Sequence, residues 1–331
     1  MRRLVLSLLI AATLPSAALA QAPKPLYRDP VFDGAADVSI VRDKAGKSWR
    51  MFYTARRASL SLADPKDVAW VHETAIGVAT SKDGLSWRYD GTAKVPAACT
   101  GATLWAPDVF VDGGLYHMWL SVVPGTFHRW GDPEATAKIV HLTSKDLKAW
   151  TCADTLDLGS DRVIDAGVIK KPGGGYRLWF KDERANSRIF AADSADLKTW
   201  TRQPAPIGDF AAEGPKAFFF QNAWWMIVDG WRGLIALKSD DAQTWTRQTR
   251  LLLDRPGSRL TDLDLGHHAD VVVNDGRAYL YYFVQQGHES QADTDPTWSQ
   301  RSVIQVSELY VMDGNLRTDR DAIVRNPLKA P

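Results

Sequence analysis

The sequence has 331 residues, with 40 Lys and Arg against 39 Asp and Glu, so its formal net charge is +1 at pH 7. This balance excludes the strongly basic surface typical of proteins that bind nucleic acids or anionic membranes, and it fits a neutral ligand better. After residue 20 there is no run of about 18 uninterrupted apolar residues, so no membrane-spanning helix is expected. The 14 Trp residues stand out, because indole rings fill cores and also stack on the apolar faces of sugars.

The first twenty residues have the features of a cleavable export signal. Arginines at positions 2–3 precede an apolar run over residues 4–14, and Ala-Leu-Ala at 18–20 supplies the small-x-small pattern that signal peptidase reads. The apolar run is too short to span a bilayer. We therefore expect residues 1–20 to be a signal peptide and residues 21–331 to form one domain in the periplasm or the medium.

The two cysteines, Cys99 and Cys152, would meet an oxidising compartment after export. A disulfide between them would tie the segment before Trp105 to the segment after Trp150. The sequence does not supply the distance between them, so a disulfide and two free thiols both remain open.

A seven-residue motif with Ser first, Asp third and Trp last occurs four times, at intervals of 63, 50 and 45 residues. Such a period is typical of four-stranded propeller blades. Because the copies recur at equivalent positions, we interpret them as blade architecture and not as sugar-binding sites. The Trp residues of the four copies are Trp87, Trp150, Trp200 and Trp245.

Two β-rich runs joined by a turn precede each copy, and a fifth pair follows the last copy. The fifth pair is completed by strands expected at Ser302 to Leu309 and Asn315 to Thr318. The sequence therefore predicts an all-β protein, a five-bladed β-propeller of four-stranded antiparallel blades. The expected pairs are Asp37 to Val41 with Trp49 to Tyr53, Asp108 to Val111 with Tyr116 to Leu120, Val168 to Lys170 with Tyr176 to Phe180, Lys216 to Phe220 with Trp224 to Val228, and Asp270 to Val273 with Ala278 to Val284.

The innermost strand of every blade lines the central channel of a propeller, so functional residues should occupy equivalent positions on these strands. Three carboxylates in such a ring are costly as packing, because buried charges need partners. They suit cleavage of a glycosidic bond, which needs an acid for the leaving oxygen, a base for water and a neighbour that tunes the acid. Counting back eight or nine residues from each hairpin turn gives Asp37, Trp105, Asp165, Glu213 and His268.

The segments around these positions are Asp37-Val38-Ser39-Ile40, Trp105-Ala106-Pro107-Asp108, Ile164-Asp165, Glu213-Gly214-Pro215 and Gly266-His267-His268. In this order they resemble the blade motifs of glycoside hydrolase family 43, whose members are five-bladed propellers. The family usually has Pro after the first Asp and after the third-blade Asp, where this sequence has Val38 and Ala166.

The resemblance implies an inverting glycosidase with Asp37 as general base, Glu213 as general acid and Asp165 as the carboxylate that raises the pKa of the acid. It implies that Trp105 and Asp108 shape the sugar subsite. It also implies that His268 faces the channel, sometimes near a structural calcium ion bound through water; no cofactor is otherwise required.

Asp37 and His268 each have a neighbouring rival residue, and Asp108 and a further candidate for substrate binding, Arg232, each have a second possible role. Asp29, in an Arg-Asp-Pro sequence, competes with Asp37, and His267 competes with His268 because adjacent strand residues face opposite sides. Asp108 could contact substrate or bond to a neighbouring blade. Arg232 could reach a sugar hydroxyl or be a surface cation.

The sequence thus predicts an exported, monomeric glycosidase acting on plant-type poly- or oligosaccharides, of the α-L-arabinofuranosidase or β-xylosidase type. Substrate specificity is expected in the inserts that carry Trp70, His72, His128 and Trp130. Three alternatives remain open: a retaining or phosphorolytic propeller enzyme, a carbohydrate-binding propeller without activity, and a propeller that binds other proteins. The sugar, the linkage and exo against endo action stay undetermined.

Overall fold

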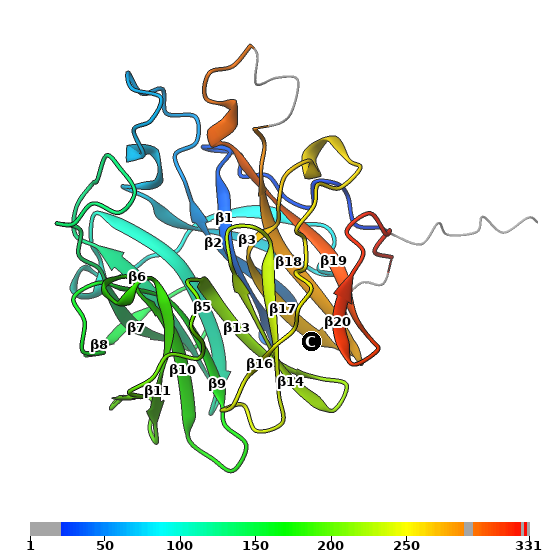
Figure 1. Cartoon of the computed structure of the whole chain (residues 1–331). Coiled ribbons are helices and arrows are strands. Elements are labelled where there is room, and N and C mark those ends of the chain that lie inside the picture. The colour runs from blue at the N-terminus through cyan, green and yellow to red at the C-terminus, as the bar shows by residue number, and fades with distance from the viewer. Residues whose placement is uncertain (1–20, 288–293, 326–327, 330–331) are drawn as a thin grey trace, which may run out of the picture.

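The computed structural model describes residues 21–287, 294–325 and 328–329, so the expected signal peptide lies outside the described residues. Five sheets of four antiparallel strands stand around a common axis, which confirms the predicted five-bladed propeller (Figure 1). Each blade is one continuous piece of chain. The strands are β1 (Ala35–Asp43), β2 (Ser48–Ala55), β3 (Ala75–Ser81), β4 (Arg88–Thr92); β5 (Thr103–Asp112), β6 (Leu115–Val123), β7 (Lys138–Ser144), β8 (Thr151–Thr155); β9 (Val163–Lys170), β10 (Tyr176–Asp182), β11 (Arg188–Ser194), β12 (Thr201–Arg202); β13 (Glu213–Phe220), β14 (Ala223–Asp229), β15 (Leu234–Ser239), β16 (Thr246–Arg247); and β17 (His267–Asn274), β18 (Arg277–Gln285), β19 (Ser302–Met312), β20 (Asn315–Thr318).

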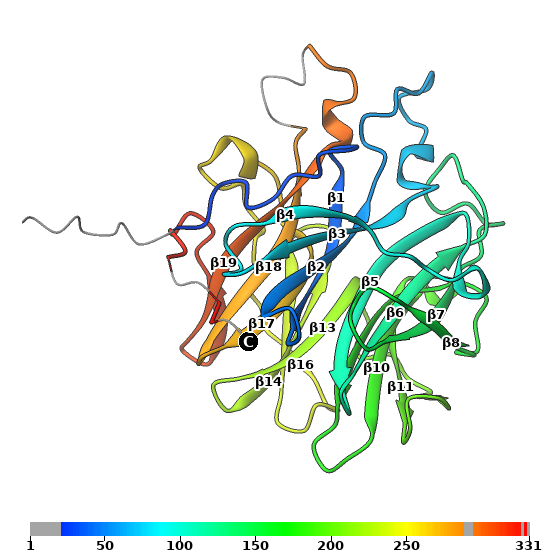
Figure 2. The same ribbon diagram turned by 180° about the vertical axis from the view of Figure 1, so that it is seen from behind.

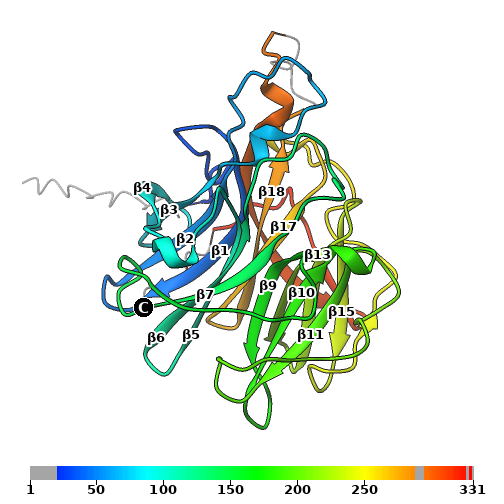
Figure 3. The ribbon, with the colours of Figure 1, turned by 90° about the vertical axis from the view of Figure 1, so that its left-hand side faces the viewer.

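Helix is confined, in the described part of the chain, to short 3-10 turns, and none of its helices could cross a membrane. The connection after β2, blue in Figures 1 and 3, and residues 294–301 before β19, orange, project from the same end of the molecule. The 3-10 turns are η1 (Ala69–Val71), η2 (Ala97–Cys99), η3 (Glu183–Ala185), η4 (Leu260–Asp262) and η6 (Trp298–Gln300).

The ring closes without a strand shared between blades. Strands β1, β5, β9, β13 and β17 contact one another in this order, and β17 contacts β1. The segment before β1 also pairs with blade five, because Tyr27 and Ile304 exchange two backbone hydrogen bonds of 3.1 and 2.9 Å. The view from behind shows this segment passing beside β19 (Figure 2).

The hydrophobic core is divided into clusters that each lie between two neighbouring blades. The motif tryptophans belong to these clusters: Trp150 packs edge-on against Phe52 of blade one, with ring centroids 5.8 Å apart. Trp245 packs in the same way against Trp179 of blade three, at 5.7 Å. The prediction that these residues are structural is confirmed.

The polar part of the motif forms the turn that precedes each Trp. In the first copy the Ser81 hydroxyl donates to Asp83 Oδ1 at 2.9 Å, and that oxygen accepts the backbone N–H groups of Leu85 and Ser86. The other three copies repeat this pattern. An Asp that satisfies two backbone donors fixes the turn between the third and fourth strands.

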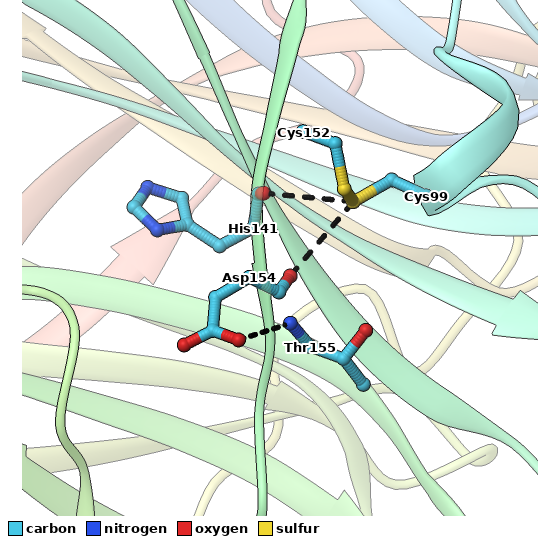
Figure 4. Close-up of a disulfide and its surroundings, with 5 residues drawn as sticks. All are labelled: Cys99, His141, Cys152, Asp154 and Thr155. Carbon is cyan, nitrogen blue, oxygen red and sulfur yellow. Dashed lines mark hydrogen bonds between the residues drawn. A yellow bond between two sulfur atoms is a disulfide. The ribbon is translucent and has the colours of Figure 1, made fainter.

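Cys99 and Cys152 form a disulfide with Cα atoms 5.5 Å apart, which closes the question that the sequence left open (Figure 4). Cys99 ends η2 and Cys152 lies on β8, so the bond ties the outermost strand of blade two to the segment that leads into β5. Both residues pack against the core between blades one and two.

Candidate active site

A cavity of about 480 Å³ is lined by residues from all five blades. Its volume lies within the range of roughly 300 to 1,000 Å³ that is usual for small-ligand sites. The walls include the five positions found by counting in the sequence, which confirms that they converge: Asp37, Trp105, Asp165, Glu213 and His268.

Every innermost strand carries the same β-bulge at the cavity. In each blade two residues of the first strand lie opposite one of the second, as between the pairs Trp105–Ser121 and Asp108–Trp119. A bulge adds one residue and turns its side chain out of the regular alternation. The first bulge residues are Asp37, Ala106, Asp165, Gly214 and His268, and the first four have positive φ angles of 49°, 45°, 60° and 57°.

The bulge corrects the counting made on the sequence in one respect. Asp37, Asp165 and His268 occupy the bulge, whereas Trp105 and Glu213 are the last paired residues before it. Both positions face the cavity, because the bulge breaks the alternation of side chains. The first strands therefore begin earlier than predicted and contain their site residues.

Asp37 is buried and ion-paired. Arg56 Nη2 lies 3.1 and 3.3 Å from its two carboxylate oxygens, and the Arg56 guanidinium lies over the ring of Phe283, 4.6 Å from the centroid. His268 Nδ1 lies 3.5 Å from Asp37 Oδ1 and 4.0 Å from Asp165 Oδ2, so the imidazole stands between the two carboxylates.

Glu213 is paired with a lysine on the neighbouring blade. Lys181 Nζ lies 2.9 Å from Glu213 Oε2 and 3.0 Å from Glu183 Oε1, and Arg162 completes the chain of charges by pairing with Glu183. Burial alone would raise the pKa of Glu213, but the Lys181 ammonium outweighs it and holds this pKa below its usual value. Glu213 is therefore ionised in the free protein.

The ion-pair partner of Asp165 is His268, whose Nδ1 lies 4.0 Å from Oδ2. Burial, together with the negative charges of Glu213 and Asp37, raises the pKa of Asp165 to about 7, although His268 acts in the opposite direction. Burial would lower the pKa of His268, but the surrounding carboxylates, Asp165 first, raise it above its usual value. Asp165 therefore titrates near neutral pH, and its titration is coupled to that of His268.

His267 and His268 both line the cavity, so the choice between them is not exclusive. His267 Nδ1 contacts Asp229 Oδ2 at 3.1 Å, and the His267 ring stacks on Phe283. The His268 ring faces Asp37 and Asp165. The His268 ring packs on Gly214, where a Cβ atom would lie 2.6 Å from it. Only glycine leaves room for the imidazole at this point, and it also accepts the positive φ.

Beneath the bulges, the first paired residues after the bulge in β5, β13 and β17, namely Asp108, Lys216 and Asp270, form a second layer of the channel. Lys216 Nζ lies 2.7 Å from Asp108 and 2.9 Å from Asp270. The same two carboxylates accept the backbone N–H groups of Val168 and Ile40 from neighbouring blades. Asp108 is thus a link between blades and does not line the cavity, so its role as a substrate contact is not supported.

Two other sequence candidates also lie outside the cavity lining. Asp29 is buried where its carboxylate accepts the Tyr53 hydroxyl at 2.5 Å and the backbone N–H groups of Val31 and Phe32, so it shapes the N-terminal loop. Arg232 is exposed to solvent, and the side chain that reaches the cavity from this turn is that of its neighbour Trp231.

The residues of the channel do not fit the calcium ion that the resemblance implies. In the chain as described, with its gaps, no group of three or more His, Cys, Asp and Glu side chains is arranged to hold a metal. His268 lies between two carboxylates that raise its pKa above its usual value, and the layer beneath it already contains the Lys216 ammonium. We therefore assign no metal to the channel.

Counting did not find Arg56, Lys181, Glu183 and Trp231, all of which line the cavity. The first and second strands are antiparallel, so the end of each second strand meets the start of each first strand, as Lys181 opposite Ile164 shows. Charged residues at the ends of second strands were the signal that could have found Arg56 and Lys181.

Comparison with protein families identifies the family to which the residues of this site belong. Residues 27–259 match the family of glycoside hydrolase 43-related domains, described as "Probable glycosyl hydrolase domain". The chain belongs to this family. The matched part of this glycosyl hydrolase domain includes Asp37, Trp105, Asp165 and Glu213 and ends before β17, which carries His268.

Over 177 residues the chain is 32% identical to two uncharacterized proteins of Mycobacterium tuberculosis, MT1551 and Rv1502. The match covers 50% of this chain, and the chain spans about half (54%) of the length of these curated relatives.

Solved structures of family 43 share the fold. An exo-1,5-α-L-arabinanase from a bovine ruminal metagenomic library superimposes with a TM-score of 0.64 at 15% identity, over 88% of this chain and 99% of that one. A β-xylosidase/α-arabinofuranosidase from a compost microbial metagenome, solved with xylotriose, gives 0.64 at 14% identity, over 91% and 98%. At these identities the likeness shows the fold alone.

Proposed function

We propose that this glycosyl hydrolase domain removes a pentose, an α-L-arabinofuranosyl or β-D-xylosyl unit, from a plant-type oligosaccharide or polysaccharide, with inversion. The observation that carries the proposal is the set of three carboxylates in one cavity with different partners. Asp37 and Glu213 are ion-paired with Arg56 and Lys181, whereas the partner of Asp165 is His268 at 4.0 Å and its pKa is raised to about 7. Hydrolysis requires carboxyl groups in different protonation states at the same pH. The names of the superimposed arabinanase and xylosidase support the pentose.

In the proposed mechanism Asp37 is the general base. Its ion pair with Arg56 and its contact with His268 fix its orientation toward the cavity. An ionised carboxylate can take a proton from a water molecule as the oxygen of that water attacks the anomeric carbon. The C–O bond to the leaving sugar breaks on the opposite side, and that oxygen receives a proton from the acid.

Glu213 is the proposed acid, and Asp165 is the proposed group that raises its pKa. In the free protein Lys181 opposes this role, since it holds Glu213 ionised. Substrate must therefore weaken the Lys181–Glu213 ion pair, so that the proton carried by Asp165 is transferred to Glu213. The raised pKa of Asp165 also favours a second assignment, in which Asp165 itself donates the proton to the leaving oxygen.

The test is release of 4-nitrophenol from a panel that includes the α-L-arabinofuranoside, the β-D-xyloside and the β-D-galactoside. We expect turnover of one pentoside by the wild type and its loss in Asp37→Ala, because no other group would activate water. Phe219→Ala, a change outside the cavity, is the matched control and should retain activity. Proton NMR of the first product would give the anomer, and a retained configuration would contradict inversion.

If neither the panel nor pentose oligosaccharides were turned over, the proposed hydrolase activity would be contradicted. Binding of those oligosaccharides without turnover would instead support a carbohydrate-binding propeller. Phosphate-dependent turnover would indicate a phosphorylase.

We also propose that the protein is exported and monomeric. The support for export is the sequence of residues 1–20. Expression with its own N-terminus, followed by mass determination, should give a chain that begins at Gln21, and light scattering should give the mass of one chain. An uncleaved product in the cytoplasmic fraction would contradict export.

A further inference from the structure

Trp231 is an exposed tryptophan held at the cavity wall by a buried carboxylate. It follows β14 with φ of 59°, and its backbone N–H donates to Asp229 Oδ1 at 2.7 Å. Asp229 is 1% exposed and also binds His267 and the backbone N–H of His268. A positive φ is costly for a bulky residue and persists where the surroundings impose it, often at functional sites.

The indole of Trp231 is not used to fill the core. It remains 41% exposed and lines the cavity. Lys181 Nζ lies 5.2 Å from the centroid of its ring, within the range of a cation–π contact. The same ammonium group lies 2.9 Å from Glu213 Oε2, so one side chain joins the indole to the proposed acid.

The position beside the acid determines which part of a substrate would meet the indole. A general acid must contact the glycosidic oxygen, and the sugar attached to that oxygen departs. A group joined to the acid by a single ammonium is therefore close to the departing sugar. Indole rings stack on the apolar faces of sugar rings, and Lys181 offers N–H donors to the hydroxyl groups.

We propose that Trp231 and Lys181 form the subsite for the leaving group, and that the natural leaving group is a second sugar ring. This inference rests on the proposed function, with Glu213 as the acid. The cavity of about 480 Å³ lies within the range of roughly 300 to 1,000 Å³ that is usual for small-ligand sites.

The test compares two leaving groups on the same glycone in wild type and Trp231→Ala. Xylobiose or arabinobiose presents a sugar to the subsite, whereas β-D-xylosyl or α-L-arabinofuranosyl fluoride presents an atom too small to reach the indole. We expect kcat/KM on the disaccharide to fall about five- to tenfold, with KM carrying most of the change, and kcat/KM on the fluoride to stay within twofold. Trp231→Phe should restore most of the loss.

Phe219→Ala is the control, because Phe219 is 51% exposed on β13 of the same blade and does not line the cavity. Equal losses on both leaving groups, or none on the disaccharide, would overturn the subsite while leaving the hydrolase intact. If the wild type turns over neither probe, the proposed function fails, and calorimetric titration with xylobiose and arabinobiose decides the subsite. Weaker binding by Trp231→Ala supports it, and any other result overturns it.

Discussion

Lys181 and Glu213 form an ion pair inside the cavity, with Nζ 2.9 Å from Oε2, although they belong to different blades. The pair sets the charge of the proposed acid, because the ammonium holds the Glu213 pKa below its usual value. It therefore links the packing of two blades to the pH at which the site can work.

Replacement of this lysine should move the pH profile. A general acid works while it is protonated, so activity falls as pH rises through its pKa. Lys181→Met removes the charge that lowers the Glu213 pKa, so the alkaline limb of kcat/KM should move to higher pH. Lys181→Arg keeps the charge and should keep the limb. An unchanged limb in Lys181→Met would show that Lys181 does not control the acid.

The identity of the acid can be decided from the leaving group. Loss of the acid matters little for 2,4-dinitrophenolate, which leaves without protonation, and costs about 10²- to 10⁴-fold for a sugar. We expect Glu213→Gln to show this contrast and Asp165→Asn to lose activity on both substrates to a similar extent. The reverse pattern, measured as kcat/KM on both substrates, would assign the acid to Asp165.

Two buried histidines between blades two and three should make stability depend on pH. His117 Nδ1 and His141 Nε2 are 2.9 Å apart, and both rings stack with Trp119. Burial, with a smaller contribution from His117, lowers the pKa of His141 to about 4. Because its pKa is lowered in the folded state, the imidazole of His141 binds a proton more readily in the unfolded chain. The contribution of His141 to the free energy of unfolding is therefore complete above about pH 6.5 and is lost as pH falls toward 4.

Urea unfolding at pH 7.5 and pH 4.5 measures this effect. His141→Gln can still hydrogen-bond but does not titrate, so its free energy of unfolding should fall less than that of the wild type, by on the order of 2 kcal/mol. An equal fall in both proteins would contradict the assignment to His141.

The disulfide should contribute to stability because it joins residues 53 positions apart. Closing a loop of this length restricts the unfolded chain by about 4 kcal/mol at 25 °C in the chain-entropy estimate. The Cys99→Ser, Cys152→Ser double variant should therefore unfold at lower urea concentration with its activity kept, since neither cysteine lines the cavity. An unchanged urea midpoint would show that the unfolded chain is restricted to the same extent without the disulfide.

The fold could be predicted because its signals are local and repeated. Four copies of one turn, each followed by a Trp that packs between blades, are sufficient to give the blade period. The site could be predicted to the level of five ring positions, since a constant distance from the hairpin turn reflects constant strand length.

What could not be predicted depends on the bulge and on neighbouring blades. The bulge puts His267 and His268 on the same cavity wall, contrary to the alternation expected of a regular strand. Asp108 could not be separated from the substrate contacts, because its partner Lys216 lies 108 positions away. Trp231 was passed over in favour of Arg232, since the positive φ that directs this turn is a tertiary effect.

The contact between His268 and Asp37 joins the last blade to the first, at the place where the ring closes without a shared strand. Every other pair of neighbouring blades is connected by the chain, whereas this junction is held by side chains, by the segment before β1 and by Leu328 after β20, whose backbone N–H donates to Asp83 O at 2.7 Å. The two halves of the catalytic centre therefore come together only when the junction is shut. Recovery of activity during refolding would report the final step of assembly, and a ring that opens at the junction would be inactive while each blade remained intact.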